Sequence, residues 1–178
     1  VVELEVHEAR RGLIRANHSS THLLHYALRE RLGEHVKQAG SLVAPDRCRF
    51  DFTHYTALSE REKDRVEELV NERIIENHPV EVMEMDIDQA IAAGAMALFD
   101  EKYGDKVRVV TVKDVSKELC GGTHASASGD IGLFKIVSEA GIAAGVRRLE
   151  ILAGRRAYQA VRREEQSLRD IAQMLTAS

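Results

Sequence analysis

Apolar residues recur along the chain at two spacings, one typical of strands and one typical of helices. The strand-like spacing, in which every second residue is apolar or a short apolar run occurs, is found in stretches bounded by turn residues. These stretches are residues 2–6, 35–43, 47–52, 80–85, 107–112, 131–138 and 145–152. Because they come in adjacent groups with helices between the groups, the pattern predicts a mixed α+β fold with a mainly antiparallel sheet and packed helices.

Helical spacing of apolar residues predicts the remaining regular elements. The first predicted helix covers residues 15–31, carries a stripe of leucines on its buried side, and ends at Gly33. A second helix starts at Ser59, which forms a capping box with Glu62, and it ends before Pro79. Further helices are predicted over residues 87–93 and 155–175.

Glycine and proline residues predict where the strands turn or deform. Pro45 and Asp46 predict a turn between the second and third strands. Gly40 interrupts the second strand, and a glycine within a strand is typical of a bulge or of a close approach to the backbone. Gly141 predicts the turn of a hairpin formed by the last two strands.

Two short motifs each have the spacing of half a metal site, His18-Ser-Ser-Thr-His22 and Cys120-Gly-Gly-Thr-His124. A four-residue step on a helix places two imidazoles on one face, one turn apart. In the second motif the glycine pair breaks regular structure and lets the thiol and the imidazole converge. Either motif alone is more often coincidence than a site, but their joint occurrence favours a metal centre.

The chemistry of these four side chains indicates which metal they would bind. Three nitrogens and one sulfur suit Zn²⁺ better than calcium or magnesium, which prefer oxygen ligands. We therefore predict Zn²⁺ as the cofactor, bound by four ligands. These are His18, His22, Cys120 and His124. His25 lies on the same helix face, and because four ligands are already present we interpret it as a packing residue or an outer contact of the site.

Composition bounds the class of protein. The 178 residues suffice for one core or for two small lobes that share an interface. With 44% hydrophobic and 30% charged residues, the composition is typical of a soluble globular protein, and no apolar run reaches the roughly 18 residues of a membrane helix. Two cysteines, one of them a predicted ligand, favour a reducing compartment, so we expect a cytoplasmic location and no membrane partner. Because the chain begins with Val1 rather than Met, we expect a piece of a longer protein.

Charge is distributed unevenly along the chain. Residues 59–102 hold 13 acids and 5 bases, a net charge of −8, whereas the remaining residues carry +4. A polyanionic partner would avoid the first region and favour arginine-bearing surfaces elsewhere, although each single arginine is more often a solvated surface charge. The arginines in question are Arg10, Arg11, Arg15, Arg147, Arg148, Arg155 and Arg156.

Several segments resemble the editing domain of alanyl-tRNA synthetase. They are Asn17-His-Ser-Ser-Thr-His-Leu-Leu-His25, Gln38-Ala-Gly-Ser-Leu-Val-Ala-Pro-Asp46, Arg49-Phe-Asp-Phe52, Gly94-Ala-Met-Ala-Leu-Phe99, Glu101-Lys-Tyr-Gly-Asp105, Glu118-Leu-Cys-Gly-Gly-Thr-His124 and Gly145-Val-Arg-Arg148. Free-standing alanyl-tRNA editing proteins share this pattern, and the threonyl-tRNA synthetase editing domain is a more distant relative. The resemblance implies the editing fold of the threonyl/alanyl-tRNA synthetase second additional domain.

The same resemblance implies a function and partners. The expected reaction is zinc-dependent hydrolysis of tRNA(Ala) mischarged with serine, and also with glycine. The expected partners are the acceptor end of that tRNA and the remaining domains of the synthetase, which would also hold its ATP site. We expect residues 1–154 to form the editing domain and residues 155–178 to form a helix that leads to a linker or to the next domain.

The resemblance also suggests residues that act beside the metal. It places Thr21 and Gln38 next to the ligands, where they would recognise the serine hydroxyl, although by position alone they read as a helix threonine and a surface glutamine. The amides of Gly121 and Gly122 would lie against the terminal adenosine or the ester oxygen. Arg147 would contact a phosphate or the pocket, with an ordinary salt bridge as its alternative explanation.

The residues leave several alternatives open. Zinc would either activate a water molecule or hold the substrate's amino group while a separate water attacks. Cys48 is either a small buried hydrophobic residue, which we favour, or a second thiol near the hairpin. The competing functions are a free-standing trans-editing deacylase and a non-catalytic, zinc-stabilised RNA-binding module.

Overall fold

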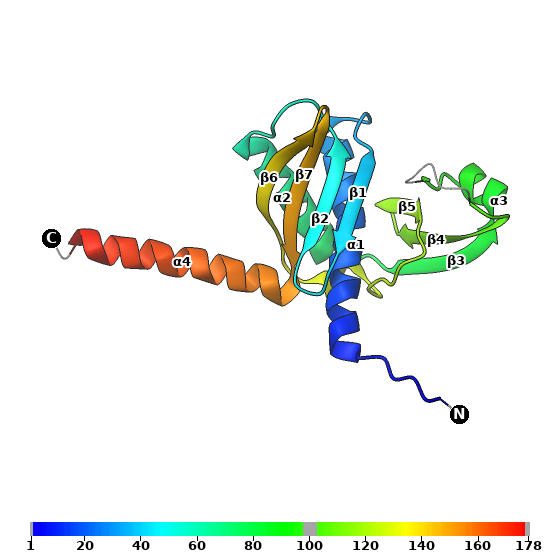
Figure 1. Cartoon of the computed structure of the whole chain (residues 1–178), viewed down its shortest axis with the longest axis horizontal. Coiled ribbons are helices and arrows are strands. Elements are labelled where there is room, and N and C mark those ends of the chain that lie inside the picture. The colour runs from blue at the N-terminus through cyan, green and yellow to red at the C-terminus, as the bar shows by residue number, and fades with distance from the viewer. Residues whose placement is uncertain (1, 98–102, 177–178) are drawn as a thin grey trace.

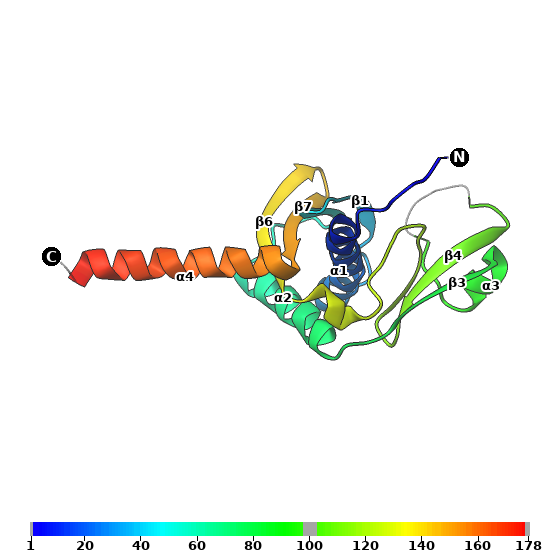
Figure 2. The same cartoon turned by 90° about the horizontal axis from the view of Figure 1, so that it is seen from below.

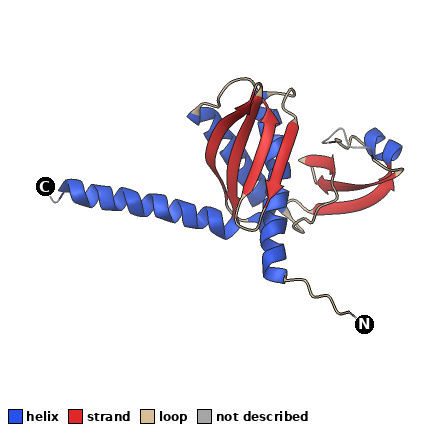
Figure 3. Cartoon of the chain, viewed as in Figure 1, coloured by secondary structure: helices blue, strands red, loops and turns tan. Residues whose placement is uncertain are grey.

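The computed structural model describes residues 2–97 and 103–176, and they form two antiparallel sheets packed with helices (Figures 1 and 3). The predicted α+β class is therefore confirmed. Parts of two resemblance segments, residues 98–99 and 101–102, lie outside the described residues.

The larger sheet has the strand order β1-β2-β7-β6, with every neighbouring pair antiparallel. Its strands are β1 (Gln38–Val43), β2 (Cys48–Thr53), β6 (Phe134–Ala143) and β7 (Val146–Ala153). Cys48, Phe50 and Phe52 alternate along β2 and are fully buried, because this face of the strand meets the helices.

Two helices cover that face, α1 (Glu8–Leu32) and α2 (Glu60–Ile75) (Figure 1). Leu24 and Leu28 of α1 pack with Phe50 and Phe52 in the main core. Fully burying a large apolar side chain of this kind stabilises the fold by about 1.5–3 kcal/mol. The core thus holds α1 rigidly against the sheet, which matters because α1 also carries the predicted metal ligands.

The smaller sheet has the order β3-β4-β5 and a separate small core. It consists of β3 (Val80–Asp86), β4 (Lys106–Val112) and β5 (Ser116–Leu119), with the short helix α3 (Ile87–Ala92) packed on it. In Figure 1 this sheet stands apart from the larger sheet, on the other side of α1. The chain returns to the body through a short 3₁₀ helix, η1 (Ser128–Ile131).

The last element, α4 (Gly154–Thr176), runs away from the body in both views (Figures 1 and 2). Only its first turns pack closely, through the buried Ala157 and Ala160. The helix predicted over residues 155–175 is confirmed, whereas the proposed domain division at residue 154 stays a prediction. Among the described residues, no helix has the length and apolarity needed to cross a membrane.

Local signals in the sequence predicted several element ends correctly. Gly33 terminates α1 with a φ of 117°, and Ser59 forms the predicted capping box with Glu62 at the start of α2. The register of β1 shifts between Gln38 and Gly40, as expected for a bulge at the glycine. Such signals act within one turn or one strand, and this explains why they can be read without the fold.

The predicted strand over residues 2–6 is wrong. This segment has no regular structure, and Val2 and Leu4 are 84% and 90% exposed. Alternation alone cannot form a strand, because its backbone groups need a neighbouring strand. Instead α1 begins at Glu8, earlier than the predicted residue 15, and the His7 Nδ1 accepts a hydrogen bond from the Arg10 amide at its start.

The final hairpin also differs from the prediction. Its turn lies at residues 144–145, where Gly145 has a φ of 70°, and Gly141 instead lies inside β6 next to a register shift. The first strand of the hairpin begins at Phe134 rather than residue 131, because Asp130 accepts hydrogen bonds from two backbone amides and closes the turn of η1. A local cap therefore overrides the apolar pattern here.

Candidate metal centre

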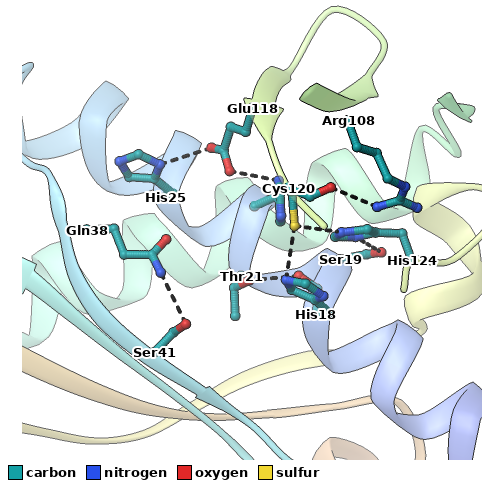
Figure 4. A network of polar contacts seen from close by, with 11 residues as sticks. His18, Ser19, Thr21, His25, Gln38, Ser41, Arg108, Glu118, Cys120 and His124 are labelled. Atoms are coloured by element: carbon teal, nitrogen blue, oxygen red, sulfur yellow. Dashed lines mark hydrogen bonds and ion pairs between the residues drawn. The ribbon is translucent and has the colours of Figure 1, made fainter. Parts of the chain in front are cut away.

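The four predicted ligands come together in the structure, although they lie on two segments about a hundred residues apart. His18 and His22 project from one face of α1, and Cys120 and His124 come from the loop that follows β5. One ligand atom from each lies within 4.8 Å of all the others. Figure 4 shows the sulfur of Cys120 between the rings of His18 and His124.

The separations fit a tetrahedral ion. Metal bonds of about 2.3 Å to sulfur and about 2.0 Å to nitrogen, at a tetrahedral angle, place sulfur and nitrogen about 3.5 Å apart. The Cys120 Sγ lies 3.5 Å from His18 Nε2 and 3.3 Å from His124 Nε2. Two of the separations thus match a tetrahedral ion, and the four side chains together are close enough to hold one.

Glycine is required in the loop because the His18 ring occupies the space where a side chain would begin. A Cβ atom on Gly122 would overlap the His18 imidazole, whereas one on Gly121 would meet nothing within 4 Å. The guanidinium of Arg108 fixes the same loop by donating hydrogen bonds to the carbonyls of Cys120 and Gly122. Arg15 on α1 adds a hydrogen bond to the Thr123 hydroxyl.

Buried polar groups orient the imidazoles from behind. Glu118, which is 1% exposed, places one carboxylate oxygen 3.0 Å from His25 Nδ1 and the other 2.7 Å from His22 Nδ1. The contact to His22 is an ion pair that lacks the geometry of a directed hydrogen bond. A carboxylate at Nδ1 leaves Nε2 for a metal, which is the usual arrangement of metal-binding histidines.

The Ser19 hydroxyl plays the same part for His124. It lies 3.1 Å from His124 Nδ1 and also accepts a hydrogen bond from the backbone amide of Ala125. This pairing leaves Nε2 of His124 facing Cys120. The interpretation of His25 as an outer contact agrees with this geometry, since its ring meets Glu118 rather than the sulfur.

The electrostatics at Cys120 and His124 favour the protonation states that bind metal. Burial alone would raise the pKa of Cys120, but hydrogen bonds with His124, His18 and His22 outweigh it and lower the pKa to about 3. Burial, together with the charges of His22 and His18, lowers the pKa of His124 to about 4 despite its bond to Cys120. A thiolate and a neutral imidazole are the forms that coordinate a metal.

The Glu118 carboxylate and His22 stabilise each other's charges. Burial alone would lower the pKa of His22, but the negative charge of Glu118 raises it well above its ordinary value. Conversely, burial would raise the pKa of Glu118, but the charge and close contact of His22 and the hydrogen bond with His25 lower it. The buried carboxylate thus stays ionised and adds negative charge directly behind the cluster.

A cavity of about 430 Å³ opens over the cluster. Its walls come from α1, from β1 of the larger sheet, and from β4, β5 and their flanking loops in the smaller sheet. The described lining residues are His18, Thr21, His22, Gln38, Ser41, Tyr103, Gly104, Lys106, Val107, Arg108, Leu119, Cys120 and Gly121. A cavity of this size is typical of small-molecule sites.

Of the other side chains predicted at the site, two line the cavity and one does not. Thr21 and Gln38 both line the cavity, and the Thr21 hydroxyl also donates to the His18 carbonyl, as an ordinary helix threonine does. Gln38 donates to the Ser41 hydroxyl. Arg147 is not among the described lining residues and pairs with Glu139 on the larger sheet. The roles assigned to these side chains stay predictions.

Sequence reasoning missed several residues around the site. Glu118 lies on β5, a strand that the sequence pattern did not predict, two positions before Cys120. Along an extended segment this spacing places both side chains on one side, and it could have indicated Glu118. Ser41, Lys106 and Arg108 carried no local signal, because only the packing of the two sheets brings them to the cavity.

The structure favours one of the two interpretations of Cys48. The side chain is fully buried in the main core, its thiol donates to the Asn17 carbonyl, and burial raises its pKa to about 12. Cys48 is therefore a packed, protonated thiol with no part in the cluster.

Comparison with known proteins defines the class of this domain. Residues 107–150 match the family described as the threonyl and alanyl tRNA synthetase second additional domain. This match spans β4, β5, the Cys120 motif and most of the final hairpin. The matched residues include Cys120 and His124, whereas His18 and His22 lie before them in the chain.

Longer matches identify the particular relatives. The chain is 58% identical to the alanine–tRNA ligase of Halorhodospira halophila over 159 residues, which are 89% of this chain and 18% of the ligase. It is 56% identical to that of Desulfosudis oleivorans over 177 residues and 57% identical to that of Desulfitobacterium hafniense over 176 residues, in each case 99% of this chain and 20% of the ligase.

The resemblance predicted from the sequence is confirmed: this chain is related to alanyl-tRNA synthetase over nearly its whole length. It spans about a fifth of the length of the relatives it matches.

Proposed function

We propose that this domain hydrolyses the ester bond of tRNA(Ala) mischarged with serine or glycine, as a cis-editing part of an alanyl-tRNA synthetase. The observation that carries the proposal is the cluster of four ligand-type side chains at the floor of a substrate-sized cavity. The relationship to alanine–tRNA ligases supplies the substrate class.

Zn²⁺ is the metal that best suits the cluster. Its donor set of three imidazole nitrogens and one thiolate is of the kind that zinc prefers, and calcium and magnesium prefer oxygen. The short separations between Cys120 and the two nearest imidazoles support a compact tetrahedral ion. We assign His18, His22, Cys120 and His124 as its ligands.

The need for a second site follows from the size of alanine. A pocket that accepts alanine cannot strongly exclude the smaller glycine, and it rejects serine imperfectly, because one extra hydroxyl changes binding by only a few kcal/mol. An editing site must instead accept serine and reject alanine. It hydrogen-bonds the serine hydroxyl, so that correct alanine leaves buried polar groups unpaired at about 1–3 kcal/mol each.

We assign this selection to Thr21 and Gln38. Both line the cavity, and the Gln38 amide is held by the Ser41 hydroxyl, which fixes its orientation. The Thr21 oxygen donates to a helix carbonyl and keeps its lone pairs for a substrate hydroxyl. The amino acid therefore lies against α1 and β1 in the proposed complex.

The chain's own residues position the reacting ester. When bound, Zn²⁺ supplies a Lewis acid that either activates water or holds the substrate's amino group. The backbone at Gly121 and Gly122 offers close approach for the ester or the terminal adenosine, because neither carries a side chain. We keep the proposal that Arg147 contacts a phosphate group outside the cavity. That phosphate would compete with Glu139 for the Arg147 guanidinium.

The remaining expectations concern the context of the domain. Its partners would be the acceptor end of tRNA(Ala) and the other domains of the synthetase, where the ATP site would lie, and its location would be the cytoplasm. Residues 1–154 would form the editing domain and residues 155–178 the connecting helix.

A deacylation assay combined with metal analysis tests the proposal. We expect about one zinc per chain and rapid hydrolysis of seryl-tRNA(Ala), with alanyl-tRNA(Ala) left largely intact. The Cys120→Ala variant should lose both zinc and hydrolysis. Bound zinc and tRNA affinity without any hydrolysis would instead identify a non-catalytic RNA-binding module.

A further inference from the structure

The cavity over the metal cluster has one cationic wall. Lys106 and Arg108 occupy alternate positions of β4, so both side chains leave the same face of the strand and both line the cavity. No carboxylate is among the described lining residues. This is unexpected for a chain with 29 acidic and 25 basic residues, and it makes the cavity attractive to an anion.

The two acids opposite this wall on β3 form no ion pair with it within the described part of the chain. Strand β3 pairs Glu84 and Asp86 with Arg108 and Lys106, but neither acid lines the cavity. Arg108 turns away from β3, because its guanidinium binds the carbonyls of Cys120 and Gly122 beyond β4. The ammonium group of Lys106 has no hydrogen-bond or ion-pair partner among residues 2–97 and 103–176, although its backbone pairs with Asp86 of β3.

The opposite wall is polar and uncharged. It consists of Gln38 and Ser41 on β1, and Figure 4 shows this pair on one side of the cluster and Arg108 on the other. The substrate proposed above matches these two walls, because it has an uncharged hydroxyl at one end and a negatively charged phosphate at the other. Tyr103, near the cationic wall, adds an aromatic ring on which a base can stack.

We propose that Lys106, assisted by Arg108, binds the 5′-phosphate group of the terminal nucleotide of the RNA. The aminoacyl ester then lies over the metal cluster, with the amino acid toward β1 and the nucleotide toward β4. This inference rests on the proposed function, and it adds the direction in which the substrate enters and the side chain that receives its phosphate. Arg108 supplies charge at a fixed position, whereas Lys106 supplies an uncommitted ammonium group.

Two minimal substrates separate phosphate recognition from ester hydrolysis. They are the seryl ester of adenosine and the seryl ester of adenosine 5′-monophosphate, each assayed with the zinc-loaded chain. The variants are Lys106→Ala, Lys106→Arg and, as a matched control, Lys113→Ala. Lys113 is an exposed lysine after the other end of β4 and does not line the cavity.

We expect the unaltered chain to prefer the phosphorylated ester through KM, by about tenfold, the effect of one hydrogen-bonded contact to a charged group. Lys106→Ala should remove that preference without changing kcat for the unphosphorylated ester. Lys106→Arg should retain most of it, and Lys113→Ala should match the unaltered chain. A preference that survives in Lys106→Ala, or an equal loss of kcat on both esters, would overturn the proposal.

A binding measurement keeps this inference separate from the proposed function. Adenosine 5′-monophosphate and adenosine are titrated into the zinc-loaded chain by calorimetry. Tighter binding of the monophosphate, lost in Lys106→Ala, would support the phosphate site even if neither ester were hydrolysed. Equal binding of both nucleosides to the unaltered chain would refute the phosphate site even if seryl-tRNA(Ala) were deacylated.

Discussion

At the scale of single residues, Gly122 is the position where the backbone and a ligand ring meet most closely. Because Gly122 has no side chain, the His18 imidazole can occupy the adjacent space. The metal site therefore requires glycine here, in addition to any requirement of the turn. A Cβ atom on the preceding residue, Gly121, would meet nothing within 4 Å, so the same substitution at Gly121 serves as a control.

We expect Gly122→Ala to weaken metal binding strongly, because the added methyl group must displace the His18 ring. Gly121→Ala should bind metal almost as the unaltered chain does. Competition with a chromophoric chelator measures both affinities. Equal affinity in the two variants would show that His18 can move aside and that the close approach has no role in coordination.

Glu118 is a second residue whose effect reaches the site through another side chain. Its two oxygens face Nδ1 of His22 and Nδ1 of His25, and both nitrogens can donate. In Glu118→Gln one of those donors would face the amide NH₂ group. We expect metal affinity to fall by about 10–100-fold, the usual effect of losing an outer contact.

The absorption spectrum of the cobalt-substituted chain reports the same change, since it is sensitive to ligand geometry. Glu81→Gln, an exposed site on β3, removes a carboxylate without touching the cluster and serves as the control. An unchanged affinity and spectrum in Glu118→Gln would show that the histidines hold their orientation without the carboxylate.

Gln38 provides the test of amino-acid selection. We expect Gln38→Ala to lower the ratio of seryl to alanyl hydrolysis by about 5–100-fold, the effect of losing one well-placed hydrogen bond to the substrate hydroxyl. Zinc content should stay constant, because Gln38 is not a ligand. Gln89→Ala, on the exposed side of α3, is the control, and an unchanged ratio in Gln38→Ala would remove the residue from recognition.

At the scale of elements, α2 does more than cover the sheet, because its polar side chains satisfy the outer edge of β6. The Asn71 amide exchanges two hydrogen bonds with the backbone of Phe134, and Glu67 accepts one from the Ile136 amide. A sheet edge without such partners is a site for unwanted strand pairing. The helix and the edge strand therefore form one unit.

Asn71→Ala should lower the free energy of unfolding by about 1–3 kcal/mol, because it leaves the buried Phe134 amide and carbonyl without their partner. Urea denaturation measures this change. Glu68→Ala, an exposed position on the same helix, should change stability by no more than about 0.5 kcal/mol. Equal effects in the two variants would mean that the β6 edge is satisfied by solvent.

At the scale of the whole molecule, the metal cluster joins α1 to the loop after β5, and so it connects the helix of the main core to the smaller sheet. The main core, which holds Phe50, Phe52 and their neighbours, includes none of the four ligands. Metal binding should thus add stability to a chain that already folds.

Removal of the metal by a chelator should lower the melting temperature by about 5–10 °C when the free metal had been about 100-fold above its Kd. Far-ultraviolet circular dichroism should stay close to that of the loaded chain. In Cys120→Ala, the chelator should have little further effect. An identical melting temperature with and without metal in the unaltered chain would contradict a role of the cluster in joining the two sheets.

The sequence alone determined features that depend on neighbours a few residues apart. Gly33 and the pair Ser59 and Glu62 predicted helix ends, and the spacing of His18 and His22 placed both rings on one helix face. The relationship to alanyl-tRNA synthetase was also readable, because its motifs are short and contiguous.

Only the tertiary structure decided which distant groups meet. Residues 2–6 alternate like a strand but form none. Lys106 and Arg108 can be linked to ligand binding only because the fold brings β4 to the cavity. Likewise Glu118 reaches His22 because β5 packs against α1. These contacts join residues far apart in the chain, and their energies depend on burial and on partners that no local pattern specifies.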